Sequence, residues 1–289
     1  MNGAIGFVLH PREGFQSLAA AIAVAERHGV GTWVVTVDAE RTLAERVPGS
    51  RLVVTVGGDG TFLLGARAAA SCGVPVLGVN RGQLGFLTDV ELGALPAALE
   101  EFLAGRSGLS RRSLLEVTIP ADAENGGEVT ATALNEVVAR SLGRNVARLR
   151  VDADGELLGE FDADGVIIAT ATGSTAYALS AGAPPVDPRV RAVMVVPLAP
   201  FAVFTRPVVL PEMTRLGITL VRGRALAVAD GHLEVPLSVG CRVAVDPGPE
   251  LLVVTVPGAP TFLRRLREKM RLGTPLKRPG DGTDAVEVD

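Results

Sequence analysis

Cysteine and aromatic residues are scarce in this sequence. Of its 289 residues only 2 are cysteine, and aromatic residues make up 4%, with a single Trp and a single Tyr. Two cysteines are too few for a disulfide scaffold. Because Cys72 and Cys241 are each flanked by apolar or small residues, we expect both to be buried free thiols.

The sequence also lacks an excess of positive charge and a long hydrophobic run. Its formal net charge of −4 argues against nucleic acid as a partner, which would require a basic face. We expect no signal peptide, because the segment MNGAIGFVLHPREG has no basic residues before its apolar run and that run is short. No stretch approaches a membrane span without charge, Gly or Pro. We therefore expect a cytoplasmic protein with no membrane partner.

Hydrophobic residues make up 47% of the sequence, which is enough to form a large core. Up to about residue 110, short apolar runs alternate with helical patterns. Strands are predicted at 4–9, 32–37, 51–56 and 74–80, and helices at 17–29, 42–47, 61–71 and 91–105. This alternation predicts an α/β, Rossmann-like domain over 1–110 with a mostly parallel sheet.

From 111 to 258 the pattern changes to short strand-like runs separated by Gly, Asp or Pro, with a hairpin signal at Asp154–Gly155. We expect a mainly-β, sandwich-like second domain. A helical pattern returns at 261–273, and the simplest place for it is against the first domain, so that 259–275 complete the α/β fold. The acidic, Gly-rich tail 279–289 is expected to be flexible.

The loop Gly57-Gly58-Asp59-Gly60-Thr61 follows the apolar strand Leu52–Val56 and precedes a helix that we expect to start at Thr61. Such a turn directs backbone N–H groups and a positive helix end to the edge where open α/β sheets bind ligands. Its glycines let a phosphate approach the backbone, and Thr61 can cap the helix. The loop therefore predicts a site for the phosphates of a nucleotide.

Asp59 is unexpected in a loop that holds phosphate, because its carboxylate repels the ligand. A general base beside an acceptor hydroxyl, or a contact to Mg²⁺, would explain it. A structural interpretation stays open: Asp tolerates a left-handed turn and caps helices.

Two further polar segments are candidates for ligand contacts. Asn135 and Glu136 stand between apolar runs, and an amide beside a carboxylate can hold the two hydroxyls of a ribose, although a simple turn is the alternative. In the stretch 164–182 an apolar run leads into small hydroxylated residues, and the single tyrosine, Tyr177, lies there. On its own this stretch is equally explained as a Ser/Thr-rich turn before a helix.

The glycine loop resembles the loop shared by NAD kinases, diacylglycerol and sphingosine lipid kinases, and phosphofructokinases. Asn80–Leu87 resembles the Asn-x-Gly-x-Leu-Gly-Phe segment of NAD kinases, and Asn135-Glu136 resembles their Asn-Glu/Asp motif. The stretch 164–182 (DGVIIATATGSTAYALSAG) resembles their longest signature, and Asp230-Gly231-His232 resembles their Asp-Gly-Gln. Because these motifs occur in the family's order, the chain resembles the NAD kinase family.

The resemblance implies phosphorylation of the 2′-hydroxyl of the NAD adenosine ribose, with ATP or polyphosphate as donor and Mg²⁺ or another divalent cation as cofactor. It also implies a homodimer or homotetramer. Asp59 would be the catalytic base, and Gly57, Gly58, Gly60 and Thr61 the phosphate-donor loop. The residues implied to bind NAD are Asp59, Gly60, Phe86, Asn135, Glu136, Arg148, Asp164, Thr175, Ala176, Tyr177, Ala178, Leu179, Ser180 and His232.

The sequence departs from the family pattern at several positions. Ala171 replaces a Pro, Ala183 replaces a Gly, and residues 199–202 lack the expected His. Asp162 stands where bacterial members often carry Arg, and Arg144 or Arg148 can supply the missing positive charge.

Two other functions remain open from sequence. A lipid kinase of the diacylglycerol type shares the glycine loop but would need an apolar acceptor pocket. A non-catalytic NAD(H)-binding regulator would explain the departures, although it would not need Asp59.

Overall fold

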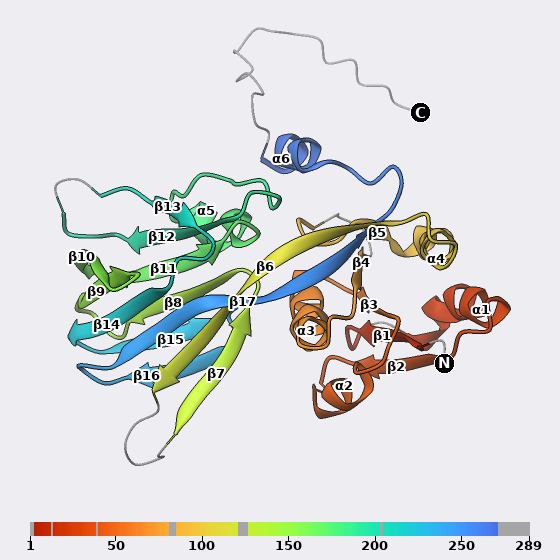
Figure 1. Ribbon diagram of the computed structural model, residues 1–289, viewed down its shortest axis with the longest axis horizontal. Helices are drawn as coiled ribbons and strands as arrows, with labels where there is room; N and C mark the ends of the chain where they lie inside the picture. Colours follow the sequence, from red (N-terminus) through yellow and green to blue (C-terminus); the bar gives the residue numbers. More distant parts are fainter. Residues whose placement is uncertain are drawn as a thin grey trace, which may run out of the picture. The chain divides into compact units, whose positions relative to one another are not determined.

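The computed structural model describes residues 3–12, 14–38, 40–80, 85–120, 127–202 and 205–270 (Figure 1). Its contacts divide the chain into one compact unit, Met1–Ala259, and a second unit, Pro260–Asp289. The compact unit contains both predicted domains, and their boundary near residue 110 stays a prediction.

The first part of the compact unit is a parallel sheet in the order β5-β4-β3-β1-β2. Its strands are β1 (Ile5–Leu9), β2 (Thr32–Thr36), β3 (Leu52–Val56), β4 (Val76–Asn80) and β5 (Val90–Glu91). The helical segments are η1 (Phe15–Leu18), α1 (Ala19–Arg27), α2 (Glu40–Arg46), α3 (Asp59–Ala70), η2 (Leu92–Ala94) and α4 (Leu95–Leu103). The predicted α/β alternation is confirmed.

Apolar side chains alternate between the two faces of this sheet and bury both of them. Phe7 of β1 belongs to a core cluster with residues of α1 and α4, such as Val24 and Leu99. Its neighbour Val8 belongs to another cluster with residues of α3, such as Phe62. Successive strand side chains point to opposite faces, so helices are needed on both sides.

The rest of the compact unit is built from strands and two short helical segments. The strands are β6 (Gly108–Pro120), β7 (Glu128–Ala133), β8 (Glu136–Ser141), β9 (Ala147–Ala153), β10 (Glu156–Ala163), β11 (Gly165–Thr170), β12 (Ala192–Leu198), β13 (Val208–Pro211), β14 (Leu216–Arg222), β15 (Ala225–Ala229), β16 (Leu233–Leu237) and β17 (Arg242–Thr255). The helical segments are η3 (Gly173–Thr175) and α5 (Tyr177–Ser180). The Asp154–Gly155 hairpin is confirmed, with φ of 50° and 83°.

These strands form two stacked layers, as the sandwich prediction requires. A 6-stranded sheet has the order β13-β12-β11-β8-β15-β16. One core cluster joins it to the facing strands, for example through Val166 and Ile168 of β11 and Val151 of β9. The edge strand β16, which contains Pro236, was not predicted. An edge position tolerates proline, since one side of the strand needs no ladder partner.

Strand β17 differs most from the sequence prediction. Residues 242–248 and 251–257 were expected as two strands, but β17 runs unbroken from Arg242 to Thr255. Its register with β6 shifts between Pro247 and Glu250, which marks a bulge. A Cβ on Gly248 would lie 2.9 Å from the backbone of Leu115, so glycine permits the strands to approach there.

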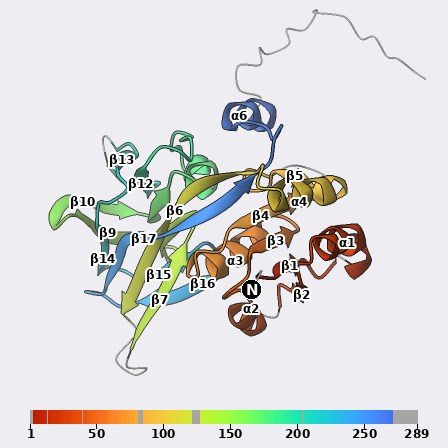
Figure 2. The same ribbon diagram turned by 45° about the vertical axis from the view of Figure 1, so that its right-hand side comes forward.

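Because of β17, strands from both predicted domains join in one 11-stranded sheet with the core order β10-β9-β14-β17-β4-β3-β1-β2. Val245 of β17 pairs antiparallel with Leu216 of β14, and Val253 pairs parallel with Val76 of β4. Figures 1 and 2 both show β6 and β17 as a long, twisted pair that runs from the β-rich half into the α/β half.

The second unit contains the helix α6 (Phe262–Met270). The predicted helix is therefore confirmed, and its packing against the first domain stays a prediction. The tail 279–289, which we expect to be flexible, lies outside the described residues.

The expectation of two buried thiols is wrong. Both cysteines are free, but Cys72 is exposed and Cys241 is half-buried. Cys72 lies in the turn that follows α3, where Ala69, Ala70 and Val74 take the buried positions instead. Flanking apolar residues do not bury a side chain that points away from them at a helix end.

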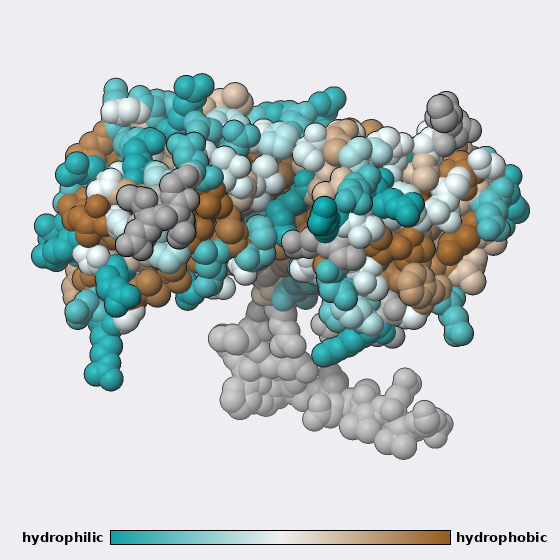
Figure 3. All heavy atoms as spheres, turned by 90° about the horizontal axis from the view of Figure 1, so that it is seen from below, coloured by the Kyte–Doolittle hydropathy of each residue, from teal (hydrophilic) through white to brown (hydrophobic). Residues whose placement is uncertain are grey.

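On the face shown in Figure 3, hydrophobic patches are separated by hydrophilic side chains. In the described ranges, none of the helices has the length and hydropathy needed to cross a membrane.

Candidate active site

The glycine loop joins β3 to α3, and the helix begins earlier than predicted. Gly58 is the extended N-cap, with φ −86° and ψ −173°, and α3 starts at Asp59 rather than at Thr61. Thr61 is therefore a buried residue of the first turn and not the cap. A Cβ on Gly57 would lie 2.4 Å from the Thr61 Oγ1, so glycine is required for this close approach. The Gly60 and Thr61 amides lie where a helix offers N–H groups to an anion.

Neither structural interpretation of Asp59 holds. The residue is helical, so it is not in a left-handed turn, and the N-cap position belongs to Gly58. The carboxylate lies against Gly85 of the second loop: a Cβ on Gly85 would be 2.2 Å from the Asp59 Oδ1 and 3.1 Å from Cγ. A carboxylate is thus held between two loops at the carboxyl ends of neighbouring strands β3 and β4.

The second loop follows Asn80 at the end of β4, and its residues 81–84 lie outside the described residues. The Gly85 N–H donates to the buried Thr88 Oγ1 at 2.9 Å, which fixes the loop where it meets Asp59. Phe86 is half-buried, so it is not a core aromatic and can offer part of its ring to a ligand.

A second polar cluster gathers at one end of the 6-stranded sheet around Asp230. Its carboxylate accepts hydrogen bonds from the backbone N–H groups of Leu134, Asn135 and Glu136 at 2.8, 2.8 and 3.1 Å. Asp230 itself has a positive φ of 44°. Next to it, His232 is exposed. The turn after β15 therefore fixes the Asn135-Glu136 segment where β8 begins.

Glu136 is the most perturbed acid of this cluster. Burial, which is the largest cause, and the nearby Asp230 together raise the pKa of its carboxyl to about 7, and a hydrogen bond from the Tyr177 backbone N–H opposes the shift. In the part of the chain that the structure describes, its Oε2 is buried without a hydrogen-bond partner. A buried oxygen without a partner is costly unless a ligand hydroxyl satisfies it.

The hydroxyl-rich stretch after β11 packs on the same Asn-Glu segment. The Thr170 Oγ1 donates to the Leu134 carbonyl at 2.6 Å, and a Cβ on Gly173 would be only 2.0 Å from the Asn135 carbonyl oxygen. The Tyr177 side chain is 46% exposed although it is the largest apolar group of α5, whereas Ala178 is fully buried in the core. Thr175 is half-buried and Ser180 is exposed.

Other predicted residues lie elsewhere. Asp164 precedes β11, and this strand of 6 residues separates it by roughly 20 Å from Thr170. Arg148, on β9, donates to both oxygens of Asp162, at 3.0 and 2.6 Å. This ion pair lowers the pKa of Asp162 and neutralises the charge that replaces the family's Arg.

Sequence reasoning missed Arg67. Burial raises the pKa of Asp230, and the positive charge of Arg67 acts against that shift together with the backbone donors. Arg67 and Asp59 share helix α3, so this helix connects the glycine loop to the cluster around Asp230. No local motif marks Arg67, because its role depends on the packing of α3.

The comparisons with known proteins agree with this arrangement. Residues 7–107 match the ATP-NAD kinase N-terminal domain, and residues 134–255 match the ATP-NAD kinase C-terminal domain. The chain belongs to the NAD kinase family. It is 39% identical over 235 residues to an NAD kinase of Heliobacterium modesticaldum, covering 80% of this chain and 82% of the relative. It is 40% identical over 232 residues to an NAD kinase of Koribacter versatilis, covering 76% and 77%.

Solved structures of NAD kinases share the fold. A yeast NADH kinase complexed with NADH has a TM-score of 0.80 at 24% identity and covers 96% of this chain and 90% of its own. An NAD kinase from Archaeoglobus fulgidus in complex with ATP has a TM-score of 0.71 at 24% identity, covering 92% and 98%. The family fold, an α/β part with a mainly-β part, is therefore confirmed.

The raised pKa of Glu136 makes stability depend on pH. The folded protein holds a proton between pH 4.5, the ordinary value, and about 7, whereas the unfolded chain does not. The free energy of unfolding is thus expected to fall across this window, by roughly 3 kcal/mol. In Glu136→Gln this fall should disappear, as measured by urea unfolding at pH 5 and pH 8. The exposed Glu234→Gln is the control. An unchanged pH dependence in Glu136→Gln would refute the assignment.

Proposed function

We propose that this protein transfers the terminal phosphoryl group of ATP or polyphosphate to the 2′-hydroxyl of the NAD adenosine ribose, giving NADP. The observation that carries the proposal is the Asp59 carboxylate, held against Gly85 between two glycine loops in a chain of the NAD kinase family. That carboxylate is neither a cap nor a turn residue, so a chemical role explains it best.

In this mechanism Asp59 accepts the proton of the ribose 2′-hydroxyl while that oxygen bonds to the terminal phosphorus. The bond from phosphorus to the bridging oxygen breaks, and ADP or the shortened polyphosphate leaves. The amides of Gly60 and Thr61, with the close backbone of Gly57 and Gly58, bind the donor phosphates.

A divalent cation, Mg²⁺ in our proposal, neutralises charge on the donor phosphates when bound. Among the described residues, no three or more His, Cys, Asp and Glu side chains are grouped to hold a metal ion. We propose that the donor phosphates and water hold the Mg²⁺, so that Asp59 stays available as the base.

We assign NAD recognition to the cluster around Asp230. Glu136 and Asn135 would hold ribose hydroxyls, because Glu136 has a buried oxygen that needs a donor. Thr175, Tyr177 and Ser180 would contact adenosine, with Ala176, Ala178, Leu179 and His232 beside them and Phe86 against the adenine.

Asp164 would contact the nicotinamide side, and Arg148 would supply positive charge for NAD binding. Since β11 separates Asp164 from Tyr177 in one chain, we propose a homodimer or homotetramer in which a second copy brings this group to the site. Light scattering of the purified protein tests the oligomeric state, and a monomer would contradict it. We further propose that the enzyme acts in the cytoplasm.

The direct test is to incubate the protein with NAD, Mg²⁺ and ATP or polyphosphate and to measure NADP. NADP formation supports the kinase. Tight NAD binding without turnover would identify the regulator instead, and phosphorylation of diacylglycerol would identify the lipid kinase. The interrupted hydrophobic patches in Figure 3 give the lipid kinase no support on that face.

Replacement of Tyr177 should chiefly weaken NAD binding. Its ring is 46% exposed, while its backbone N–H serves Glu136, so Tyr177→Ala removes the ring and keeps that hydrogen bond. We expect the dissociation constant of NAD to rise about tenfold with a smaller change in kcat. Tyr177→Phe, which retains the ring, is the matched control. Calorimetric titration with NAD measures the effect, and equal affinity in all three proteins would exclude the contact.

A further inference from the structure

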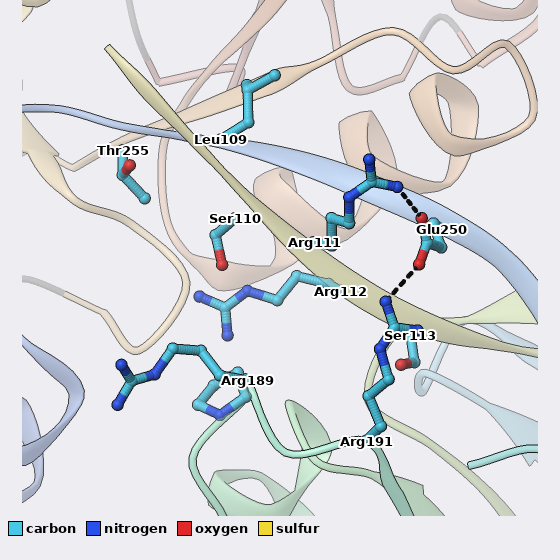
Figure 4. Close-up of a pocket in the computed structure, with 10 residues that line it drawn as sticks. Leu109, Ser110, Arg111, Arg112, Ser113, Arg189, Arg191, Glu250 and Thr255 are labelled. Carbon is cyan, nitrogen blue, oxygen red and sulfur yellow. Dashed lines mark hydrogen bonds and ion pairs between the residues drawn. The ribbon is translucent and has the colours of Figure 1, made fainter.

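A cavity of about 480 Å³ lies apart from the candidate active site and is rich in arginine. It opens between β6, the end of β17 and the segment that leads into β12 (Figure 4). Among the described residues, its lining includes Arg111, Arg112, Arg189 and Arg191 and one acidic residue, Glu250. None of these residues belongs to the proposed NAD or donor sites.

Carboxylates hold the guanidinium groups of Arg111, Arg189 and Arg191 in place. Glu250 bridges two of them, because Oε2 accepts from Arg111 at 2.6 Å and Oε1 accepts from Arg191 at 2.8 Å. Asp187 accepts from Arg189 with both oxygens, at 3.0 and 2.7 Å. Side chains that are already held lose less entropy when a ligand binds.

The arginine side chains are more exposed than the carboxylates that bind them. The Arg189 side chain is 82% exposed and that of Asp187 only 20%, while Arg191 is 57% exposed and its second partner, Glu212, only 12%. Glu250, which lines the cavity, is 38% exposed, against 65% for Arg111. Solvent therefore reaches the guanidinium groups more than the carboxylates.

Figure 4 shows the guanidinium ends of Arg112 and Arg189 extending to the same side of the cavity, with the Ser110 hydroxyl facing them. Among the described residues that line the cavity, four are arginines and one, Glu250, is acidic, in a chain whose net charge is −4.

We propose that this cavity is a binding site for a small organic polyanion that carries phosphate or carboxylate groups. Guanidinium forks match both groups with paired hydrogen bonds. The volume lies in the range of small-molecule sites, about 300–1,000 Å³, and exceeds the needs of a single inorganic ion. Leu109 and Pro188 in the lining would contact the organic part.

The test is calorimetric titration of the full chain with citrate and with inorganic pyrophosphate, in the absence of NAD and ATP. Comparing the two probes distinguishes carboxylate from phosphate ligands. We expect at least one probe to bind, and its affinity to fall at least about tenfold in Arg112→Ala/Arg189→Ala. Pyrophosphate can also bind the proposed donor loop, so only binding that is lost in Arg112→Ala/Arg189→Ala is assigned to this cavity; citrate does not resemble the polyphosphate donor, so its binding does not depend on the proposed kinase activity.

The control is Arg41→Ala/Arg46→Ala, which removes the same charge from the exposed surface of α2. It should bind the probes like the unchanged protein. Thermal unfolding without probe checks that each variant folds. Arg112→Lys/Arg189→Lys keeps both positive charges but removes the paired guanidinium donors, so its affinity for the probes should be intermediate. Unchanged affinity for both probes in the alanine pair, or no binding of either probe to the unchanged protein, overturns the proposal.

Discussion

Replacing Asp59 with Asn is expected to reduce kcat for NADP formation by roughly 10²- to 10⁴-fold, the usual contribution of a general base. The amide has the size of the carboxylate, so it fits beside Gly85, but it cannot accept the hydroxyl proton. The affinity for NAD should change little. Steady-state kinetics gives kcat, and calorimetric titration gives the dissociation constant.

Asp246→Asn is the matched control for this variant. Asp246 lies on β17 in a surface pair with Arg215 at 3.7 Å, and such pairs contribute little to stability. We expect it to behave like the unchanged protein. If Asp59→Asn lost NAD binding and turnover to the same extent, Asp59 would hold structure or metal and the base assignment would be wrong.

Gly85→Ala should impair catalysis almost as strongly, although this residue has no reactive group. Its Cβ would lie 2.2 Å from the Asp59 Oδ1 and 2.9 Å from the Thr88 Oγ1. Neither distance is possible for real atoms, so the Asp59 carboxylate has to move. A displacement of about 1 Å in a catalytic group can cost about 10²-fold in rate, and we expect a loss of kcat of this size.

The double variant Asp59→Asn/Gly85→Ala separates positioning from general damage. If Gly85 acts only through Asp59, the double variant should be no slower than Asp59→Asn alone. Gly93→Ala is the control, because a Cβ there meets nothing within 4 Å. Full activity in Gly85→Ala would show that the carboxylate is not confined as we describe.

The elements of the α/β half could be predicted from sequence because their signals are local. Gly29, predicted to end a helix, follows α1 with a φ of 68°, and Pro96 stands at the start of α4. The motif order likewise predicted the family, since each motif is a short run with its own residue pattern.

Contacts between distant segments could not be predicted. The carboxylate of Asp59 touches Gly85, and Arg148 pairs with Asp162 on the next strand. Each depends on how strands are registered, and no single segment encodes that. The same limit explains Glu136, whose pKa depends on burial and on Asp230, far along the chain.

Local breaker residues misled the prediction where tertiary pairing overrode them. Pro247 and Gly248 were predicted to end a strand, but β17 continues through them. It pairs with β6 on both sides, and the register shift there forms a bulge. Gly60 was read as loop, yet it lies in the first turn of α3.

The unbroken course of β17 makes the two halves of the compact unit mechanically dependent on each other. Its ladder with β6 extends from Ala244 to Thr255, with the bulge between Pro247 and Glu250 as its one shift of register. Hydrogen bonds on either side stiffen the strand pair, so bending concentrates at that bulge. A motion that closes the two halves on a nucleotide would therefore bend the β6–β17 strand pair at this bulge, and would not be a free rotation about a flexible linker.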